Sequence, residues 1–414
     1  MPIMLRVDEL EPGMVLANSI INRFCVLLAR GRRLTEYDIS ALRRKMPEAL
    51  VPVIDPVLDE VVDFQEDAHD RQVSSEVRRN IASVVRHVGN SVRAGMALEG
   101  PNVAGMQAVV QEMIRYLEEN PVTMAIIEQS ARWNAYLQEH SANVFYVSLV
   151  IGNTLRNYVK QERERCSALR YIPHAMDLTP LATAALFHDL GMVPIEHLYK
   201  KSEPLTDHEK ALVRAHPQRG AELLPAEIDP MTRLVVRTHH ENQDGSGYPQ
   251  GLHGEQITVF ARILRVADAY AAAISRKAYH KAKSPIRALY EMLHGDYARL
   301  YDPVILKVFA SITQPLPIGA KLKLANGQWA VVVAHNRANP FKPQIIIAFD
   351  ELGDPLERSQ LRPPFYLGER SDVRIAYFAG EDLHFLNDLP DWHDDVRHVH
   401  LERLGEELLD FMYP

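Results

Sequence analysis

The stretch LATAALFHDLG, residues 181–191, decides the fold more than any other part of the chain. Its first seven residues have the composition of a buried helix, and they lead directly into His188 and Asp189. Such a helix would carry both polar side chains into the protein interior, where an ionised carboxylate without a partner costs several kcal/mol. Because a cation is the natural partner, the stretch predicts a helical domain with a metal site at one helix end.

A second aspartate lies in an equally apolar segment further along the chain. Asp268 interrupts the run from Val266 to Ile274, which otherwise contains only Ala, Tyr, Val and Ile. Taken alone, a buried aspartate is satisfied as easily by backbone amides or by an arginine. The metal interpretation of Asp268 therefore depends on whether further ligands accompany it.

Histidines on other predicted helices, at 122–160, 206–222 and 230–240, supply these further ligands. Each histidine alone is more often an ordinary core or surface residue. Two of them are adjacent, and adjacent side chains on a helix point about 100° apart, so both reach one cluster most readily where the helix ends. The Gly-rich loop DGSGYP, residues 244–249, follows them and fits such an ending. The candidates are His140, His216, His239 and His240.

The combined ligand set contains imidazoles and carboxylates but no thiolate. Cys25 and Cys166 lie far apart in the sequence, so neither a disulfide framework nor a thiolate zinc site is predicted. Such a set suits iron, manganese or another divalent ion, and it is large enough for two ions bridged by one carboxylate. A paired centre would hold a hydroxide as the nucleophile, so the sequence predicts phosphodiester hydrolysis. The ligands are His140, His188, Asp189, His216, His239, His240 and Asp268.

In their order along the chain, these ligands, Glu241 and the loop 244–249 resemble the HD-GYP family, a bacterial branch of the HD phosphohydrolases. The resemblance covers about residues 130–312. It implies an all-helical domain and a second-messenger phosphodiesterase that hydrolyses cyclic di-GMP to pGpG, with onward hydrolysis to GMP.

The resemblance also implies a role for each site residue. His188 and Asp189 are the expected catalytic pair. One ion would take His140, His188, Asp189 and Asp268, and the other would take His216, His239 and His240, with Asp189 bridging. The expected substrate contacts are Lys277, His280 and Tyr248. The signature loop is Gly247, Tyr248 and Pro249, which the family uses to contact diguanylate cyclase domains; a tight turn that closes the site is an equally good interpretation.

Two positions depart from the family pattern. Met192 stands where a lysine usually follows the His-Asp motif, so a cation near the reacting phosphate is missing. The alternative to the enzyme is therefore a cyclic-dinucleotide sensor with little or no turnover. Tyr136 stands four residues before His140, where members with three metals carry glutamate, so we expect two ions.

The remaining sequence predicts smaller parts around the metal domain. Residues 1–65 form a small α+β module with a possible regulatory role, and it includes a helix that starts after Thr35. Residues 66–129 form a helical connector, and residues 313–414 form a β-rich C-terminal extension in which Asn326-Gly327 predicts a type I′ hairpin turn. The predicted fold class is mainly α, with an HD-type phosphohydrolase domain at 130–312.

Composition and charge limit the classes of molecule that the chain can be expected to bind. The 414 residues include 46 basic and 54 acidic ones, and the formal charge of -8 opposes binding to a nucleic acid polymer. No apolar stretch reaches the roughly 18 residues of a membrane span, and the start lacks a signal-peptide core, so we expect a cytoplasmic protein. Cyclic di-GMP is the expected ligand, and a homodimer stays an open option.

Overall fold

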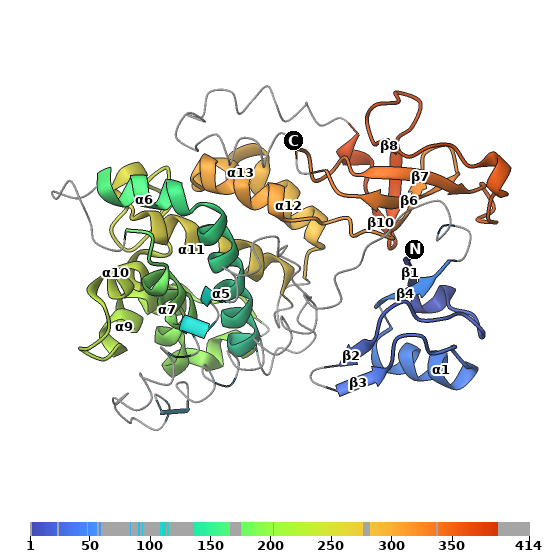
Figure 1. Cartoon of the computed structure of the whole chain (residues 1–414). Coiled ribbons are helices and arrows are strands. Elements are labelled where there is room, and N and C mark those ends of the chain that lie inside the picture. The colour runs from blue at the N-terminus through green and yellow to red at the C-terminus, as the bar shows by residue number, and fades with distance from the viewer. Residues whose placement is uncertain are drawn as a thin grey trace. The chain divides into compact units, whose positions relative to one another are not determined.

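The computed structural model divides the chain into two compact units (Figure 1). One unit contains Met1–Ala68 together with Gln314–Asp395, and the other contains His69–Thr313 together with Val396–Pro414. The structure describes residues 2–22, 25–47, 49–55, 136–165, 175–201, 203–275, 282–336 and 338–387, with isolated positions between 58 and 115.

The described part of the second unit consists mainly of helices, and many of them begin at a capping residue. Thr206 accepts a hydrogen bond from the Glu209 N–H, which confirms the capping box expected at that helix start. The α-helices are α5 (Tyr136–Thr154), α6 (Arg156–Arg165), α7 (Thr179–Phe187), α8 (Asp207–Arg214), α9 (His216–Leu223), α10 (Pro230–Thr238), α11 (Val259–Ile274), α12 (Pro285–Leu293) and α13 (Pro303–Ile312). The 3-10 segments are η3 (Leu190–Lys200), which has a kink at Ile195, η4 (Gly254–Gln256) and η5 (Gly295–Leu300).

Helix α7 lies at the centre of the helical unit. Every residue from Pro180 to Phe187 is buried. A helix that is apolar on all sides needs neighbours on all sides, and α7 packs against α5, α10 and α11. Helix α9 in turn packs against α10 and η3. The burial predicted from residues 181–187 is confirmed, and it places His188 and Asp189 inside the unit.

Two predicted helices are broken in the structure. The segment 206–222 forms α8 and α9 rather than one helix, because Pro217 has no N–H to donate to the carbonyl of Val213. The segment 122–160 is described only from Tyr136 onwards, and there it divides into α5 and α6 around Leu155. The helices expected in the 66–129 connector lie outside the described residues, apart from isolated positions.

Strands of the C-terminal extension form one antiparallel sheet in the order β10-β9-β5-β6-β7-β8. The predicted hairpin is present, but its turn is not type I′. That turn needs a positive φ at both central residues, whereas Gly327 has φ +93° and Asn326 is not among the described residues with positive φ. The strands are β5 (Lys321–Leu324), β6 (Trp329–Ala334), β7 (Gln344–Phe349), β8 (Phe365–Tyr366), β9 (Ile375–Phe378) and β10 (Glu381–Asp382), with η6 (Arg358–Gln360) and η7 (His384–Leu386).

The N-terminal segment joins the same unit. It contains β1 (Pro2–Arg6), η1 (Val7–Glu9), β2 (Ile20–Asn22), β3 (Cys25–Leu28), α1 (Glu36–Lys45) and β4 (Leu50–Ile54). Thr35 caps α1 as expected. The Met4 N–H donates to the Gly319 carbonyl at 2.8 Å, and Ile3 and Leu5 share one hydrophobic core with Val331 and Ile346. The N-terminal segment and the strands of the C-terminal extension are thus held together by burial of apolar surface.

The fold class expected from the sequence is confirmed: a helical unit accompanies N-terminal strands and a β-rich C-terminal region. Among the described residues, no helix is both long enough and apolar enough to cross a membrane.

Candidate metal centre

The seven predicted ligands converge beside the end of α7. One set of contacts joins the Nε2 atom of His140 to Asp268 Oδ1 at 3.0 Å and to His188 Nε2 at 3.3 Å. A second set of contacts joins His216 Nε2 to His239 Nε2 at 3.2 Å and to Asp189 Oδ1 at 3.3 Å. Five helices or their ends therefore contribute to one cluster, and the structure brings together every candidate ligand.

Within this cluster, two groups have the spacing of metal ligands. Within each group, the ligand atoms all lie within 4.8 Å of one another. The first group is His140, His188 and Asp189, and the second is His216, His239 and His240. The carboxylate of Asp189 faces both groups, with Oδ2 3.7 Å from His188 Nε2 and Oδ1 3.3 Å from His216 Nε2. Asp268 also lies between them, since its Oδ2 is 3.8 Å from His240 Nδ1.

Helix ends orient three of the histidines. Near the last turn of a helix, carbonyl groups lack an N–H partner within the helix. Such carbonyls accept Nδ1–H of His188 (Ala185 O, 2.9 Å), of His216 (Val213 O, 2.6 Å) and of His239 (Val236 O, 2.7 Å). A carbonyl can only accept, so each Nδ1 carries the proton and each Nε2 presents a lone pair to the cluster.

The converging lone pairs fit a cation. His216 and His239 present two Nε2 lone pairs to one another at 3.2 Å, an arrangement that is repulsive unless a positive charge lies between them. Burial lowers the pKa of His239 and His240 well below the ordinary value, and it lowers that of His216. Neutral imidazole is the form that binds metal. The donor set therefore fits a divalent metal ion.

The protonation of Asp268 is also the one that a metal requires. Burial alone would raise the pKa of Asp268, but the hydrogen bond with His140 and the neighbouring imidazoles outweigh it, and the pKa lies well below its ordinary value. An ionised carboxylate is the form that binds a metal ion.

Gly191 and Gly220 allow the close approach that joins the two groups. A Cβ added at Gly191 would lie 2.1 Å from the His216 carbonyl oxygen and 2.7 Å from the Gly220 nitrogen. Only a residue without a side chain fits where two backbones approach so closely. This crossing of η3 and α9 brings the segment after Asp189 against the segment that carries His216.

The signature loop folds back over His240. The Tyr248 ring stacks on the His240 ring with centroids 4.8 Å apart, and a Cβ at Gly247 would lie 2.3 Å from the Asn242 nitrogen. Glu241 anchors the loop, since its buried carboxylate accepts the N–H groups of Gln250 at 2.7 Å and Leu252 at 2.9 Å. Sequence reasoning gave Glu241 no role, although a carboxylate beside a Gly-rich loop is a signal for such an anchor.

Other predicted site residues have different placements. Met192 is buried in an apolar cluster with Ile195 and Leu198, against which Leu212 and Val213 pack. Lys277 and His280 lie outside the described residues, and so does the side chain of Tyr136.

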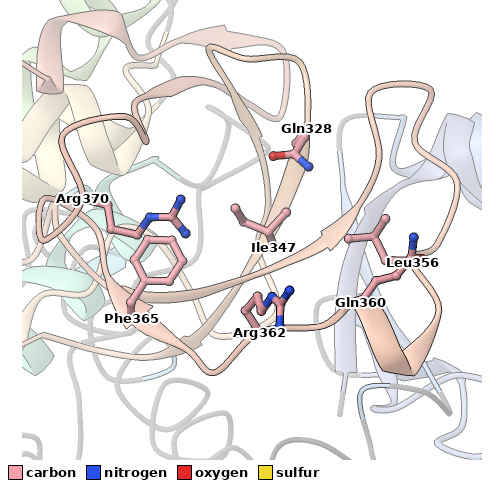
Figure 2. Close-up of a pocket in the computed structure, with 7 residues that line it drawn as sticks. All are labelled: Gln328, Ile347, Leu356, Gln360, Arg362, Phe365 and Arg370. Atoms are coloured by element: carbon pink, nitrogen blue, oxygen red, sulfur yellow. The ribbon is translucent and has the colours of Figure 1, made fainter.

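A pocket of about 110 Å³ lies in the β-containing unit, where the Arg370 guanidinium covers the Phe365 ring (Figure 2). Its lining offers no metal ligand and no nucleophile. The lining residues are Gln328, Ile347, Leu356, Gln360, Arg362, Phe365 and Arg370. None of the residues singled out in the sequence as ligands is among them.

Known proteins resemble the helical unit. Residues 149–305 match the family model described as HD domain. Cyclic di-GMP phosphodiesterase PA4108 of Pseudomonas aeruginosa is 34% identical over 170 residues, which are 40% of this chain and 40% of that protein. The 3'3'-cGAMP-specific phosphodiesterase 3 of Vibrio cholerae is 30% identical over 33% of this chain and 29% of that protein. Further relatives named cyclic di-GMP phosphodiesterases are 28% and 39% identical.

These similarities cover only part of each protein. The chain spans less than half of the length of most of these curated relatives, and just over half (55%) of one. A solved structure, "Bd1817, a HDG"Y"P protein from Bdellovibrio bacteriovorus", matches with a TM-score of 0.42 and 13% identity over 74% of this chain and 97% of that one, too weak a likeness to support an inference. Residues 149–305 therefore match the HD domain family, and the chain resembles proteins named cyclic di-GMP phosphodiesterases, as its HD-GYP motifs led us to expect.

Proposed function

We propose that the chain is a cyclic di-GMP phosphodiesterase that releases pGpG, with onward hydrolysis to GMP. The observation that carries the proposal is the cluster itself: two groups of ligand atoms, each within 4.8 Å, with the Asp189 carboxylate facing both. The names of the relatives support cyclic di-GMP as the substrate.

The cluster would hold two divalent ions, iron or manganese. One would lie at His140, His188, Asp189 and Asp268, and the other at His216, His239 and His240, with Asp189 shared. When bound, such ions activate water and polarise a phosphoryl oxygen.

The chain's own residues have separate tasks in this scheme. The helix-end carbonyls hold Nδ1–H of His188, His216 and His239, so that Nε2 stays available as a ligand atom. Asp189 remains ionised between the two groups and aligns them. Tyr248 covers His240 and restricts water on that side of the cluster.

The sensor alternative is not favoured. It rested on Met192 as the place of a missing cation, yet Met192 packs in an apolar cluster that holds η3 against α8. A module that only bound the nucleotide would also have no need of a complete set of seven ligands.

Product analysis tests the proposal. Metal-reconstituted chain is incubated anaerobically with cyclic di-GMP and, separately, with 3'3'-cGAMP, the substrate in the name of one relative, and the products are separated by chromatography. We expect pGpG from cyclic di-GMP, formed faster than any product from 3'3'-cGAMP. Intact cyclic di-GMP after loading with either iron or manganese would refute the proposal, and preferred cleavage of 3'3'-cGAMP would reassign the substrate.

Several expectations from the sequence stay predictions. These are substrate contact by Lys277 and His280, binding of diguanylate cyclase domains through Gly247, Tyr248 and Pro249, a homodimer, a cytoplasmic location, and the domain boundaries 1–65, 66–129, 130–312 and 313–414.

A further inference from the structure

Arg214 lies at the signature loop. Its guanidinium carbon is 5.1 Å from the centroid of the Tyr248 ring, and Tyr248 stacks in turn on His240. Among the described residues no carboxylate pairs with Arg214, and the side chain is exposed. An exposed guanidinium held over a ring keeps its N–H groups available to an anion.

Arg265 brings a second guanidinium to the same side of the cluster. It lies one helical turn before Asp268 on α11, and its Nε–H donates to Asn242 Oδ1 at 2.9 Å, beside the loop. Its guanidinium carbon is 5.3 Å from the Tyr301 ring centroid. Within the part of the chain that the structure describes, Arg265 has no carboxylate partner either, so its remaining N–H groups can serve a ligand.

Half-buried Arg265 and exposed Arg214 come from different helices, yet both lie beside the loop. Arg214 lies over the Tyr248 ring, and Arg265 donates to Asn242.

The apolar cluster around Met192 fixes the position of Arg214. Leu212 and Val213 of α8 pack against Met192, Ile195 and Leu198, and Arg214 is the next residue of the same helix. Met192 has no charge of its own, but it packs against the helix that carries the Arg214 guanidinium.

We infer that Arg214 and Arg265 bind the phosphodiester group of the cyclic dinucleotide that is not being hydrolysed, while the other lies at the metal cluster. The inference rests on the proposed function for its ligand. A cyclic dinucleotide carries two phosphodiesters, and a ligand centred on the cluster leaves one of them without a metal. Guanidinium groups bind phosphate through two parallel N–H donors, and such charge-assisted hydrogen bonds are the strong ones.

Substitution of each arginine in the full chain tests this role. In metal-reconstituted protein, Arg214→Gln and Arg265→Gln should each raise the KM and Kd for cyclic di-GMP about tenfold. Because these residues would hold the distal phosphate rather than the reacting one, kcat should change by no more than about twofold. The Kd is measured by titration calorimetry in the cold, and it does not depend on turnover.

Lys210→Gln is the matched control. It removes one positive charge from the same helix, one turn away, where Lys210 is paired with Asp207 at 3.0 Å. We expect its KM and Kd to stay within about twofold of the wild-type values. Arg265→Lys keeps the charge of the partly buried position, so it should bind better than Arg265→Gln even where the latter is unstable.

The outcomes separate this inference from the proposed function. If the wild-type chain binds cyclic di-GMP without hydrolysing it, the proposed function is refuted. The comparison of Kd values then still tests whether the two arginines bind the nucleotide. Hydrolysis by the wild type with KM and Kd of both arginine variants equal to those of Lys210→Gln would overturn the inference alone. A loss of kcat without a change in KM or Kd would also overturn it, and a chain that neither binds nor hydrolyses would overturn both.

Discussion

Glu241 directly follows the two adjacent histidines and holds the signature loop through two backbone N–H groups. Replacement by alanine would remove the buried carboxylate that accepts the Gln250 and Leu252 N–H groups. We expect Glu241→Ala to lower the free energy of unfolding of the metal-free chain by about 1–3 kcal/mol. Urea unfolding checks this value.

Glu203→Ala is the control for that change, because Glu203 is an exposed glutamate of the helical unit. Equal unfolding midpoints for the two variants would show that the Glu241 hydrogen bonds contribute nothing to stability. A selective loss for Glu241→Ala would establish Glu241 as the anchor of the loop.

At the scale of single residues, the sequence identified the candidate metal ligands but not the residues that surround them. Histidine and aspartate in apolar helices stand out by type, and all seven candidates converge. Glu241 and the pair Arg214 and Arg265 did not stand out, because glutamate and arginine are common on surfaces. Their roles depend on partners in other segments, which no local pattern contains.

At the scale of helices, the close approach of η3 and α9 at Gly191 and Gly220 sets the distance between the two groups of metal ligands. In Gly191→Ala the new Cβ would meet backbone atoms at 2.1 Å and 2.7 Å, so whole segments must move. We expect a loss of about 1–3 kcal/mol in the free energy of unfolding, as for other overpacked cores, together with weaker metal binding. Urea unfolding and metal analysis after dialysis measure the two effects.

Gly152→Ala is the matched glycine control. Its nearest neighbour is the flexible end of Leu181, at 2.9 Å from the added Cβ, and alanine favours a helix interior by roughly 0.5–1 kcal/mol. We expect normal metal content in this variant. Equal metal loss in both variants would contradict the role of the Gly191 crossing.

A buried ion-pair network joins α6, α11 and α13. The Arg262 guanidinium donates to Glu162 and Asp302, and all three side chains are buried. Burial alone would raise the pKa of Glu162, but hydrogen bonds from Arg165 and Arg262 outweigh it, and the pKa lies below its ordinary value of 4.5. A lowered carboxyl pKa contributes stability above pH 4.5, and that stability is lost as the pH falls through the folded-state pKa.

Removal of the arginine tests this network. Arg262→Met should cost about 3–5 kcal/mol at neutral pH, because two buried carboxylates lose the guanidinium that they share. With Glu162 less favoured as an anion, stability should also fall less steeply below pH 4.5 than in the wild type. Urea unfolding across pH measures both; Lys160→Met, an exposed change on α6, serves as control. Parallel pH curves for wild type and Arg262→Met would contradict the account.

Element types were predictable where the sequence has strong local signals. Thr35 and Thr206 start helices as their capping boxes indicate. The continuous helix predicted at 206–222 was wrong because the effect of Pro217 on the Val213 carbonyl was not considered. That same free carbonyl accepts the His216 Nδ1–H group, so the break is part of how the ligand is oriented.

For the whole molecule, the fold class was predictable from apolar patterns, but the packing of the N-terminal segment against the β-rich C-terminal extension was not. Met4 and Gly319 are joined by a hydrogen bond across more than three hundred residues, and both segments contribute to one core. Alternation along a strand indicates a buried face without indicating what covers it. Such pairing can be observed only in the folded chain.

A metal titration of the whole chain tests the central claim most directly. Metal-free protein receives iron(II) or manganese(II) in steps under anaerobic conditions, and the rate of pGpG formation from cyclic di-GMP is measured at each step. The account predicts a rate that rises to a plateau at two ions per chain, and almost no rate in Asp189→Asn, whose side chain would have to serve both groups. A rate that persists in the metal-free chain, or full turnover by Asp189→Asn, would contradict it.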